Sequence, residues 1–114
     1  MTTKSYRLLS TDKQGDTVII GMHIPEDLFY FDGHFEQIPV LPGVVQLTWA
    51  MELAIAHFGL RGEFRSIDVM KFTKIISPGA DVFLHLEYLQ PKKRLLFSYR
   101  SGDVLHSSGK IKVT

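Results

Sequence analysis

The sequence predicts an α+β fold in which an antiparallel sheet of about six strands surrounds one central helix. Two observations predict it: residues 43–58 form the one segment with clear helical spacing, and that segment is apolar on nearly every side. A helix of this kind has to be enclosed by other structure. Because strand patterns occupy most of the remaining chain, a sheet is the element that would enclose it. With 114 residues we expect a single domain spanning residues 1–114.

The first two strands are expected at 6–9 and 17–24, where β-branched and apolar residues gather. Between them lies the polar stretch 10–16 with Gly15, which suits a hairpin connection. Residues 25–42 then form an irregular segment with four aromatic residues, three prolines and Gly33. We expect an ordered loop there, and long ordered loops in small domains are often functional.

The helix is predicted over 43–58 and ends before Gly59, a residue type that favours helix termination. Four strands are predicted after it, at 64–76, 81–90, 94–100 and 104–113, separated by turn signals. Within the helix, Trp49 and Met51 are interpreted as core residues. The apolar helix positions are Val44, Val45, Leu47, Trp49, Ala50, Met51, Leu53, Ala54, Ile55, Ala56 and Phe58.

The composition excludes several classes of protein. With 45% hydrophobic and 22% charged residues, the chain is typical of a globular domain. Its formal net charge of +1 gives no broad attraction to nucleic acid or to an anionic membrane, and no apolar run reaches the length of about 18 residues that spans a bilayer. Residues 1–7 carry no signal-peptide pattern, so the cytoplasm is the expected compartment.

No cofactor is expected. The chain has no cysteine, which excludes a disulfide, a thiolate metal site and a cysteine nucleophile. The histidines at 23, 57, 85 and 106 lack metal-ligand spacing and are interpreted as surface or strand residues. The one dense basic run, 92–94, follows Pro91 and is interpreted as a solvated turn; the alternative is a docking patch for an acidic carrier protein.

The segment 31–45 carries a resemblance to a known family. Its residues Phe-Asp-Gly-His-Phe at 31–35, followed by Pro-Val-Leu-Pro-Gly-Val-Val at 39–45, resemble the signature of the β-hydroxyacyl-acyl-carrier-protein dehydratases. A weaker similarity lies at 72–81, and together the matches cover nearly the whole chain. The resemblance implies the hot-dog fold, in which a sheet curls around a central helix. The run 41–47, with Trp49 shortly after, is most similar to the aryl-polyene-type branch.

The resemblance also implies a reaction, the loss of water from a 3-hydroxyacyl thioester carried on an acyl carrier protein or on coenzyme A. His34 would be the base, because imidazole is largely neutral yet basic near neutral pH. The free backbone N–H groups at the helix start, on Gly43 and Val44, would stabilise charge on the thioester oxygen. Phe35 and Pro42 would help to hold the substrate.

The acid of this reaction is where the chain departs from the family. The dehydratases have Glu or Asp five residues after the helix-start glycine, and here that residue is Thr48. A threonine hydroxyl is no proton donor of carboxylic strength. Glu52, one turn further along the same face, is the candidate replacement if it lies deep enough for burial to raise the pKa of its carboxyl. Glu36 and Gln37 also replace the family's usual Pro-Gly beside His34.

Three functions therefore stay open: a dehydratase, a hot-dog thioesterase in which Thr48 and Glu52 activate water, and a catalytically impaired subunit that pairs with an active relative. A homodimer, or a higher oligomer of dimers, is expected because open sheet edges favour pairing with a second copy. In the family the pocket lies between subunits. The resemblance therefore implies that His34 of one subunit faces Thr48 and Glu52 of the partner subunit.

Overall fold

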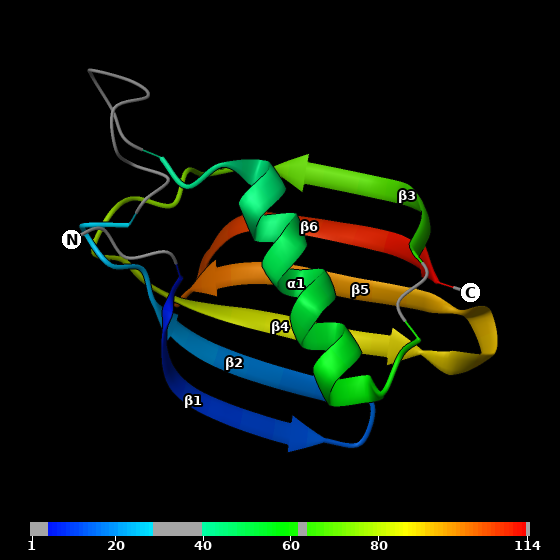
Figure 1. The fold of residues 1–114 in the computed structure, drawn as a ribbon. Coiled ribbons are helices and arrows are strands. Elements are labelled where there is room, and N and C mark those ends of the chain that lie inside the picture. The colour runs from blue at the N-terminus through cyan, green and yellow to red at the C-terminus, as the bar shows by residue number, and fades with distance from the viewer. Residues whose placement is uncertain (1–4, 29–39, 62–63, 114) are drawn as a thin grey trace.

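A computed structural model of the chain describes residues 5–28, 40–61 and 64–113. One helix, α1 (Gly43–Phe58), lies across one face of a six-stranded antiparallel sheet, as Figure 1 shows. This arrangement confirms the predicted α+β class. The strands follow the order β1 (Arg7–Gln14), β2 (Thr17–His23), β4 (Asp81–Leu89), β5 (Arg94–Ser101), β6 (Val104–Val113) and β3 (Phe64–Phe72) across the sheet, with a short 3₁₀ helix, η2 (Gln90–Lys92), between β4 and β5.

The core forms between the inner face of the sheet and the buried side of α1. Strand residues of alternating polarity place every second side chain on the inner face. Ile20 on β2, Leu84 on β4 and Tyr99 on β5 are neighbours in register and are fully buried. The other inward side chains of these strands are Val18, Met22, Val82, Leu86, Leu95 and Phe97.

The backbone conformations of the flanking residues mark both ends of helix α1. Pro42, in an extended conformation, precedes Gly43, and Gly59 ends the helix with a left-handed φ of 65°. The helix buries the side formed by Val45, Gln46, Trp49, Ala50 and Ala54.

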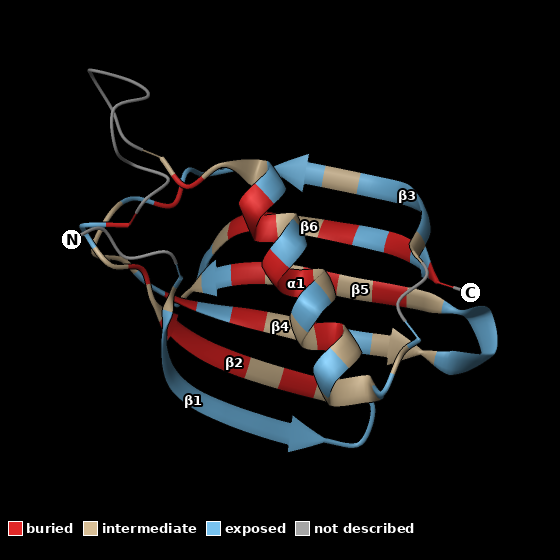
Figure 2. Cartoon of the chain, in the orientation of Figure 1, coloured by how far each residue is buried: buried red, intermediate tan, exposed pale blue. Residues whose placement is uncertain are grey.

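The expectation that α1 is enclosed on all sides is wrong for the single chain. The positions four residues apart on its outer side are exposed, namely Val44, Thr48, Glu52 and Ala56, and they form the exposed stripe of the helix (Figure 2). The sheet is only one layer and covers one side of the helix. The apolar members of the exposed stripe, Val44 and Ala56, are therefore left uncovered by the described residues of one copy of the chain.

Two strand boundaries differ from the prediction by more than one residue. β1 extends through the predicted polar connection to Gln14, because the turn lies at Gly15, whose φ is 59°, and polar residues are tolerated on an edge strand. β3 ends at Phe72 instead of continuing to residue 76. The N–H groups of Thr73 and Lys74 both donate to the His106 carbonyl, which turns the chain away from the ladder.

Strand β6 contains a β-bulge at His106. Tyr99 pairs with Ser107 and Arg100 pairs with Leu105, so His106 has no partner of its own in β5. Consecutive strand residues normally point to opposite faces, but the extra residue lets both His106 and Ser107 be buried.

Candidate active site

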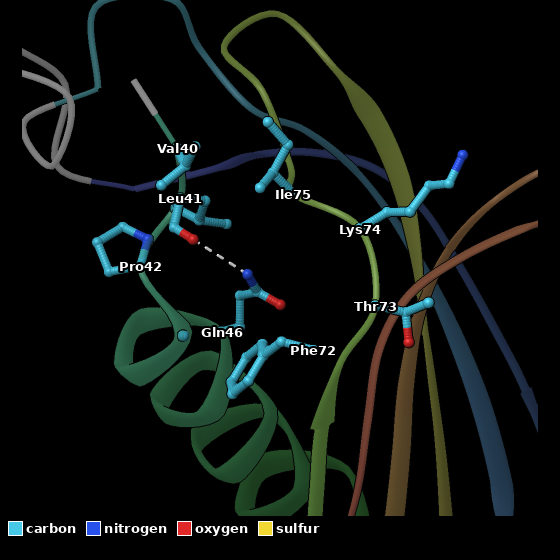
Figure 3. Close-up of a pocket in the computed structure, with 9 residues that line it drawn as sticks. Val40, Leu41, Pro42, Gln46, Phe72, Thr73, Lys74 and Ile75 are labelled. Atoms are coloured by element: carbon cyan, nitrogen blue, oxygen red, sulfur yellow. Dashed lines mark hydrogen bonds between the residues drawn. The ribbon is translucent and has the colours of Figure 1, made fainter. Parts of the chain in front are cut away.

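A pocket of about 290 Å³ opens beside the start of helix α1. One side is the leading segment (residues 40–42) with the first turn of the helix. The other is the pocket wall (residues 72–75), which consists of the last residue of β3 and the three residues after it (Figure 3). The two sides meet because β3 ends next to the beginning of α1 (Figure 1). The lining residues are Val40, Leu41, Pro42, Gly43, Gln46, Phe72, Thr73, Lys74 and Ile75.

The tip of the helix presents free donors. The N–H groups of Val45 and Gln46 bond the Pro42 carbonyl, whereas those of Gly43 and Val44 have no acceptor among the described residues. No side chain caps the helix there, and its first turn contains no acidic residue. The partial positive charge of the helix end therefore stays uncompensated within the described part of the chain. Of the predicted donors, Gly43 lines the pocket and Val44 is 68% exposed beside it.

Gly43 is covered by the ring of Phe72. A Cβ atom at position 43 would lie 2.4 Å from Cζ of that ring, so the ring occupies the place of a side chain. The sequence suggested that glycine is needed here for the approach of a ligand. In the structure, the small size of Gly43 instead makes room for the ring of Phe72. That side chain is nonetheless 55% exposed.

The two candidate acids both lie on the exposed stripe of α1. The Thr48 hydroxyl donates to the Val44 carbonyl one turn earlier, at 2.8 Å, and so bonds its own helix. Glu52 is exposed, which contradicts the premise that its carboxyl lies deep in the protein. Glu52 lies near Tyr6: burial, and then the Glu52 carboxylate, raise the pKa of that phenol. In one copy of the chain neither Thr48 nor Glu52 lines the pocket.

His34 and Phe35 lie outside the described residues, as do the departures at Glu36 and Gln37. Their segment leads directly into Val40 and Leu41, which line the pocket. The assignment of the base therefore stays a prediction.

Gln46 is a buried polar residue of the pocket that the sequence reasoning missed. Its side chain is 3% exposed and lies between the leading segment and the sheet. Its Nε2 donates to the Leu41 carbonyl at 3.1 Å (Figure 3), and its Oε1 accepts from the Ser107 hydroxyl at 2.7 Å. The available signal was one amide side chain at a helix position otherwise surrounded by apolar residues. The pocket wall was also missed, because residues 73–76 were assigned to a strand.

The described residues contain neither a metal-binding cluster nor a helix that could span a membrane. No group of three or more His, Cys, Asp or Glu side chains in that part of the chain is arranged to hold a metal ion. Over the same residues, no helix is both long and apolar enough to cross a membrane.

Comparison with known proteins connects this geometry to a family. Residues 10–110 match the family model described as ApeI-like, ApeI dehydratase. The chain belongs to the ApeI-like dehydratase family. It is also 33% identical to the 3-hydroxyacyl-acyl-carrier-protein dehydratase FabZ of Vibrio cholerae, over 86% of this chain and 73% of that protein. The FabZ of Novosphingobium aromaticivorans is 33% identical over 58% of this chain, and the match spans about half of that relative, 48%.

Solved structures agree with this membership in the ApeI-like dehydratases. The dehydratase heterocomplex ApeI:P of Xenorhabdus doucetiae matches with a TM-score of 0.89 and 29% identity, over 96% of this chain and 97% of that chain. An uncharacterized protein from Erwinia carotovora subsp. atroseptica matches with a TM-score of 0.83 and 38% identity, over 96% of each chain. The chain is thus a dehydratase-like protein with the hot-dog fold.

Proposed function

We propose that this chain dehydrates 3-hydroxyacyl thioesters, carried on an acyl carrier protein or on coenzyme A, in fatty-acid or polyene-lipid synthesis. Membership of the ApeI-like dehydratases and the 3-hydroxyacyl-acyl-carrier-protein substrate named for the FabZ relatives support the substrate class. The observation that carries the proposal is the pair of N–H groups on Gly43 and Val44, at the edge of a pocket, which have no acceptor among the described residues. Val40 and Leu41, which line that pocket, follow the segment of His34 in the sequence.

The proposed chemistry divides into three roles. His34 removes the proton beside the thioester carbonyl, and the N–H groups of Gly43 and Val44 stabilise the negative charge that develops on the thioester oxygen. The Glu52 carboxyl of a second copy of the chain gives a proton to the departing hydroxyl, so that water leaves and a double bond forms. Phe35 and Pro42 hold the acyl thioester. One proton is removed from the substrate and one is donated to the departing hydroxyl, so the step needs no oxidant or reductant.

The test is conversion of a 3-hydroxyacyl thioester to the enoyl form by purified protein. We expect His34→Ala to abolish this conversion and Glu52→Gln to reduce it. Matched controls are His57→Ala, near the far end of α1, and Glu87→Gln, an exposed carboxylate on β4. If His34→Ala equals the wild type, the assignment of the base fails. Release of thiol in place of enoyl product would instead assign the chain to the thioesterases.

The hydrogen bond of Thr48 and the exposure of Glu52, both on the exposed stripe, favour a second function. Thr48 is engaged with its own backbone, and Glu52 is exposed on the helix face that the sheet does not cover. A carboxylic acid on the exposed stripe would therefore reach a pocket only across an interface between subunits. One relative by structure is described as a dehydratase heterocomplex. The alternative proposal is accordingly that this chain is the base-carrying subunit of a hetero-oligomer whose companion chain supplies the acid.

Reconstitution separates the two proposals. The chain is assayed alone and then mixed with a companion dehydratase-like chain that carries Glu or Asp at the position of Thr48. Turnover that requires the mixture, and that is lost with His34→Ala in this chain, favours the hetero-oligomer. Full turnover by the chain alone eliminates that role and leaves the homomeric dehydratase.

A further inference from the structure

We propose that the β-bulge at His106 is a two-sided clamp that sets the geometry of the pocket, with His106 and Ser107 as positioning residues. One residue holds the pocket wall, and its neighbour holds the start of helix α1. The inference rests on the proposed function, because the pocket held in this way is the one assigned to the acyl thioester. Neither residue lines the pocket itself.

Ser107 holds the helix side. Its hydroxyl is fully buried and donates to Oε1 of Gln46 at 2.7 Å, and the Gln46 amide in turn donates to the Leu41 carbonyl at 3.1 Å. The buried Tyr99 hydroxyl adds a bond of 2.6 Å to the main-chain oxygen of Gln46. The leading segment and the first turn of α1 are thereby tied to β5 and β6. Gly43 lies between the two tied positions, Leu41 and Gln46.

His106 holds the wall side. Its main-chain oxygen accepts the N–H groups of Thr73 and Lys74, at 2.8 and 3.1 Å. Its ring nitrogen Nδ1 lies 3.1 Å from the Ile75 carbonyl, which can only accept, so Nδ1 carries a proton and donates. The other ring nitrogen lies 2.8 Å from the Ser101 hydroxyl, which fixes the ring plane. Three consecutive residues of the pocket wall are therefore bound to one residue of β6.

The bulge is what allows both contacts. In a regular strand His106 and Ser107 would point to opposite faces of the sheet, and one of them would point away from the pocket. The extra residue buries both, and bulges are known to redirect side chains in this way beside functional sites. Two consecutive residues of β6 thus hold the two opposing sides of the pocket.

The clamp predicts different kinetic effects for its two halves. Loss of the Ser107 hydroxyl should loosen the N–H groups at the helix tip, which act on charge in the transition state. We therefore expect Ser107→Ala to lower kcat about tenfold with KM little changed. His106→Leu should loosen the wall that contacts the acyl chain, and so raise KM about tenfold with a smaller effect on kcat. His106→Asn keeps a donor near the position of Nδ1 and should recover most of the affinity.

Ser108→Ala is the matched control, because Ser108 is the next residue of the same strand and lies on the other face of the sheet. It should leave both constants unchanged. Kinetics are measured on whichever assembly, the chain alone or with its companion, forms the enoyl product. If His106→Leu does not fold, His106→Ala, which removes the same donor with a smaller side chain, takes its place: KM should again rise about tenfold, and a KM equal to that of His106→Asn would overturn the wall side of the clamp.

Amide hydrogen exchange tests the clamp without any substrate. Ser107→Ala should speed exchange at the bonded amides of Leu41, Val45 and Gln46. His106→Leu keeps the main-chain carbonyl but loses the ring contact with the Ile75 carbonyl, so more frequent opening of the wall should speed exchange at Thr73 and Lys74. Each variant should leave the other set protected. Exchange equal to that of Ser108→Ala, or a uniform loss of protection over the whole sheet, would overturn the proposal. Wild-type protein that forms no enoyl product, alone or with a companion, would refute the proposed function. In that case the exchange data would still decide whether the clamp exists.

Discussion

Gly43 and Gly109 each lie under an aromatic ring, and the space available to that ring decides how much a larger residue would destabilise the protein. Phe97 lies over Gly109, and a Cβ there would be 2.3 Å from the ring; this ring is only 3% exposed. Phe72 lies over Gly43 at a similar 2.4 Å but is 55% exposed. A buried ring has no space to move into, whereas an exposed ring can swing outward.

We expect Gly109→Ala to lower the free energy of unfolding by about 1–3 kcal/mol, the usual range for overpacking a core. Gly43→Ala should cost less than about 1 kcal/mol, because its ring can move and alanine favours the helix. Urea denaturation of both variants measures the difference. Equal losses in the two variants would contradict the argument from ring freedom.

The buried phenol of Tyr99 should make the folded protein less stable at alkaline pH. Burial, with the neighbouring Tyr6 phenol adding to it, holds the pKa of Tyr99 well above its ordinary value. The unfolded chain therefore releases this proton first, at a pKa of about 10, and stability falls as the pH rises above that value. Below about pH 10 both states keep the proton, so the stabilisation is fully present there.

Tyr99→Phe should remove this part of the pH dependence. At neutral pH the variant should lose about 1 kcal/mol, the value of the hydrogen bond to the Gln46 carbonyl. Thermal melts of both proteins between pH 8 and pH 11 measure it, and the difference between them isolates Tyr99 from Tyr6. Parallel pH curves for wild type and variant would show that Tyr99 does not titrate differently on unfolding.

At the scale of an element, the exposed stripe of helix α1 has no carboxylic acid at the position where the family resemblance implies one. Its position for the family's acid holds Thr48, whose hydroxyl bonds the helix backbone. If the missing carboxyl limits turnover by the chain alone, supplying one should restore part of the reaction. General acid catalysis contributes about 10²–10⁴-fold, so we expect Thr48→Glu to raise enoyl formation by at least about tenfold.

Thr48→Gln is the matched control for this gain, since it has nearly the same shape but cannot donate a proton of carboxylic strength. It should leave turnover at the level of the unaltered chain. A gain with both variants would point to packing across the subunit interface. No gain with either would indicate that Glu52, or a companion chain, already provides the acid.

At the scale of the whole molecule, the apolar surface is concentrated on one edge of the sheet. Ile67, Val69 and Phe72 of the edge strand β3 are 50%, 41% and 55% exposed, and Val44 of the helix is exposed beside them. The opposite edge, β1, exposes Leu8 and Leu9. A second copy of the chain, or a similar companion, would cover the β3 edge and the exposed stripe together.

Val69→Lys should therefore convert the expected dimer to a monomer, because a lysine on an edge strand opposes pairing. Leu8→Lys places the same change on the β1 edge and should leave the dimer intact. Molar mass by light scattering during size-exclusion chromatography distinguishes the two. Dissociation by the β1 variant alone would assign the interface to the other edge.

The sequence alone predicted the α+β class, the helix over residues 43–58 and the number of strands, because these depend on local periodicity. It did not predict that one side of α1 stays exposed, since a helix pattern does not tell whether its cover comes from the same chain. The bulge at His106 was not visible either, because it is a property of pairing between strands. For the same reason the contacts of Gln46 with Ser107, and the wall after Phe72, were missed.

The bulge also limits how the length of this chain can change. Removing His106 itself would leave Leu105 and Ser107 alternating as in a regular strand, with both halves of β6 in register but without the residue that binds the pocket wall. Removing a residue elsewhere in β6 would turn one half of the strand over and send inward side chains such as Ile111 and Val113 toward solvent. A Cβ atom added at Gly15, in the turn, would meet no atom within 4 Å, so the hairpin tip has open space around it. Length changes should therefore be tolerated at the hairpin tip, should cost only the wall contacts at position 106, and should be rejected elsewhere in β6, which a library of single-residue deletions would reveal.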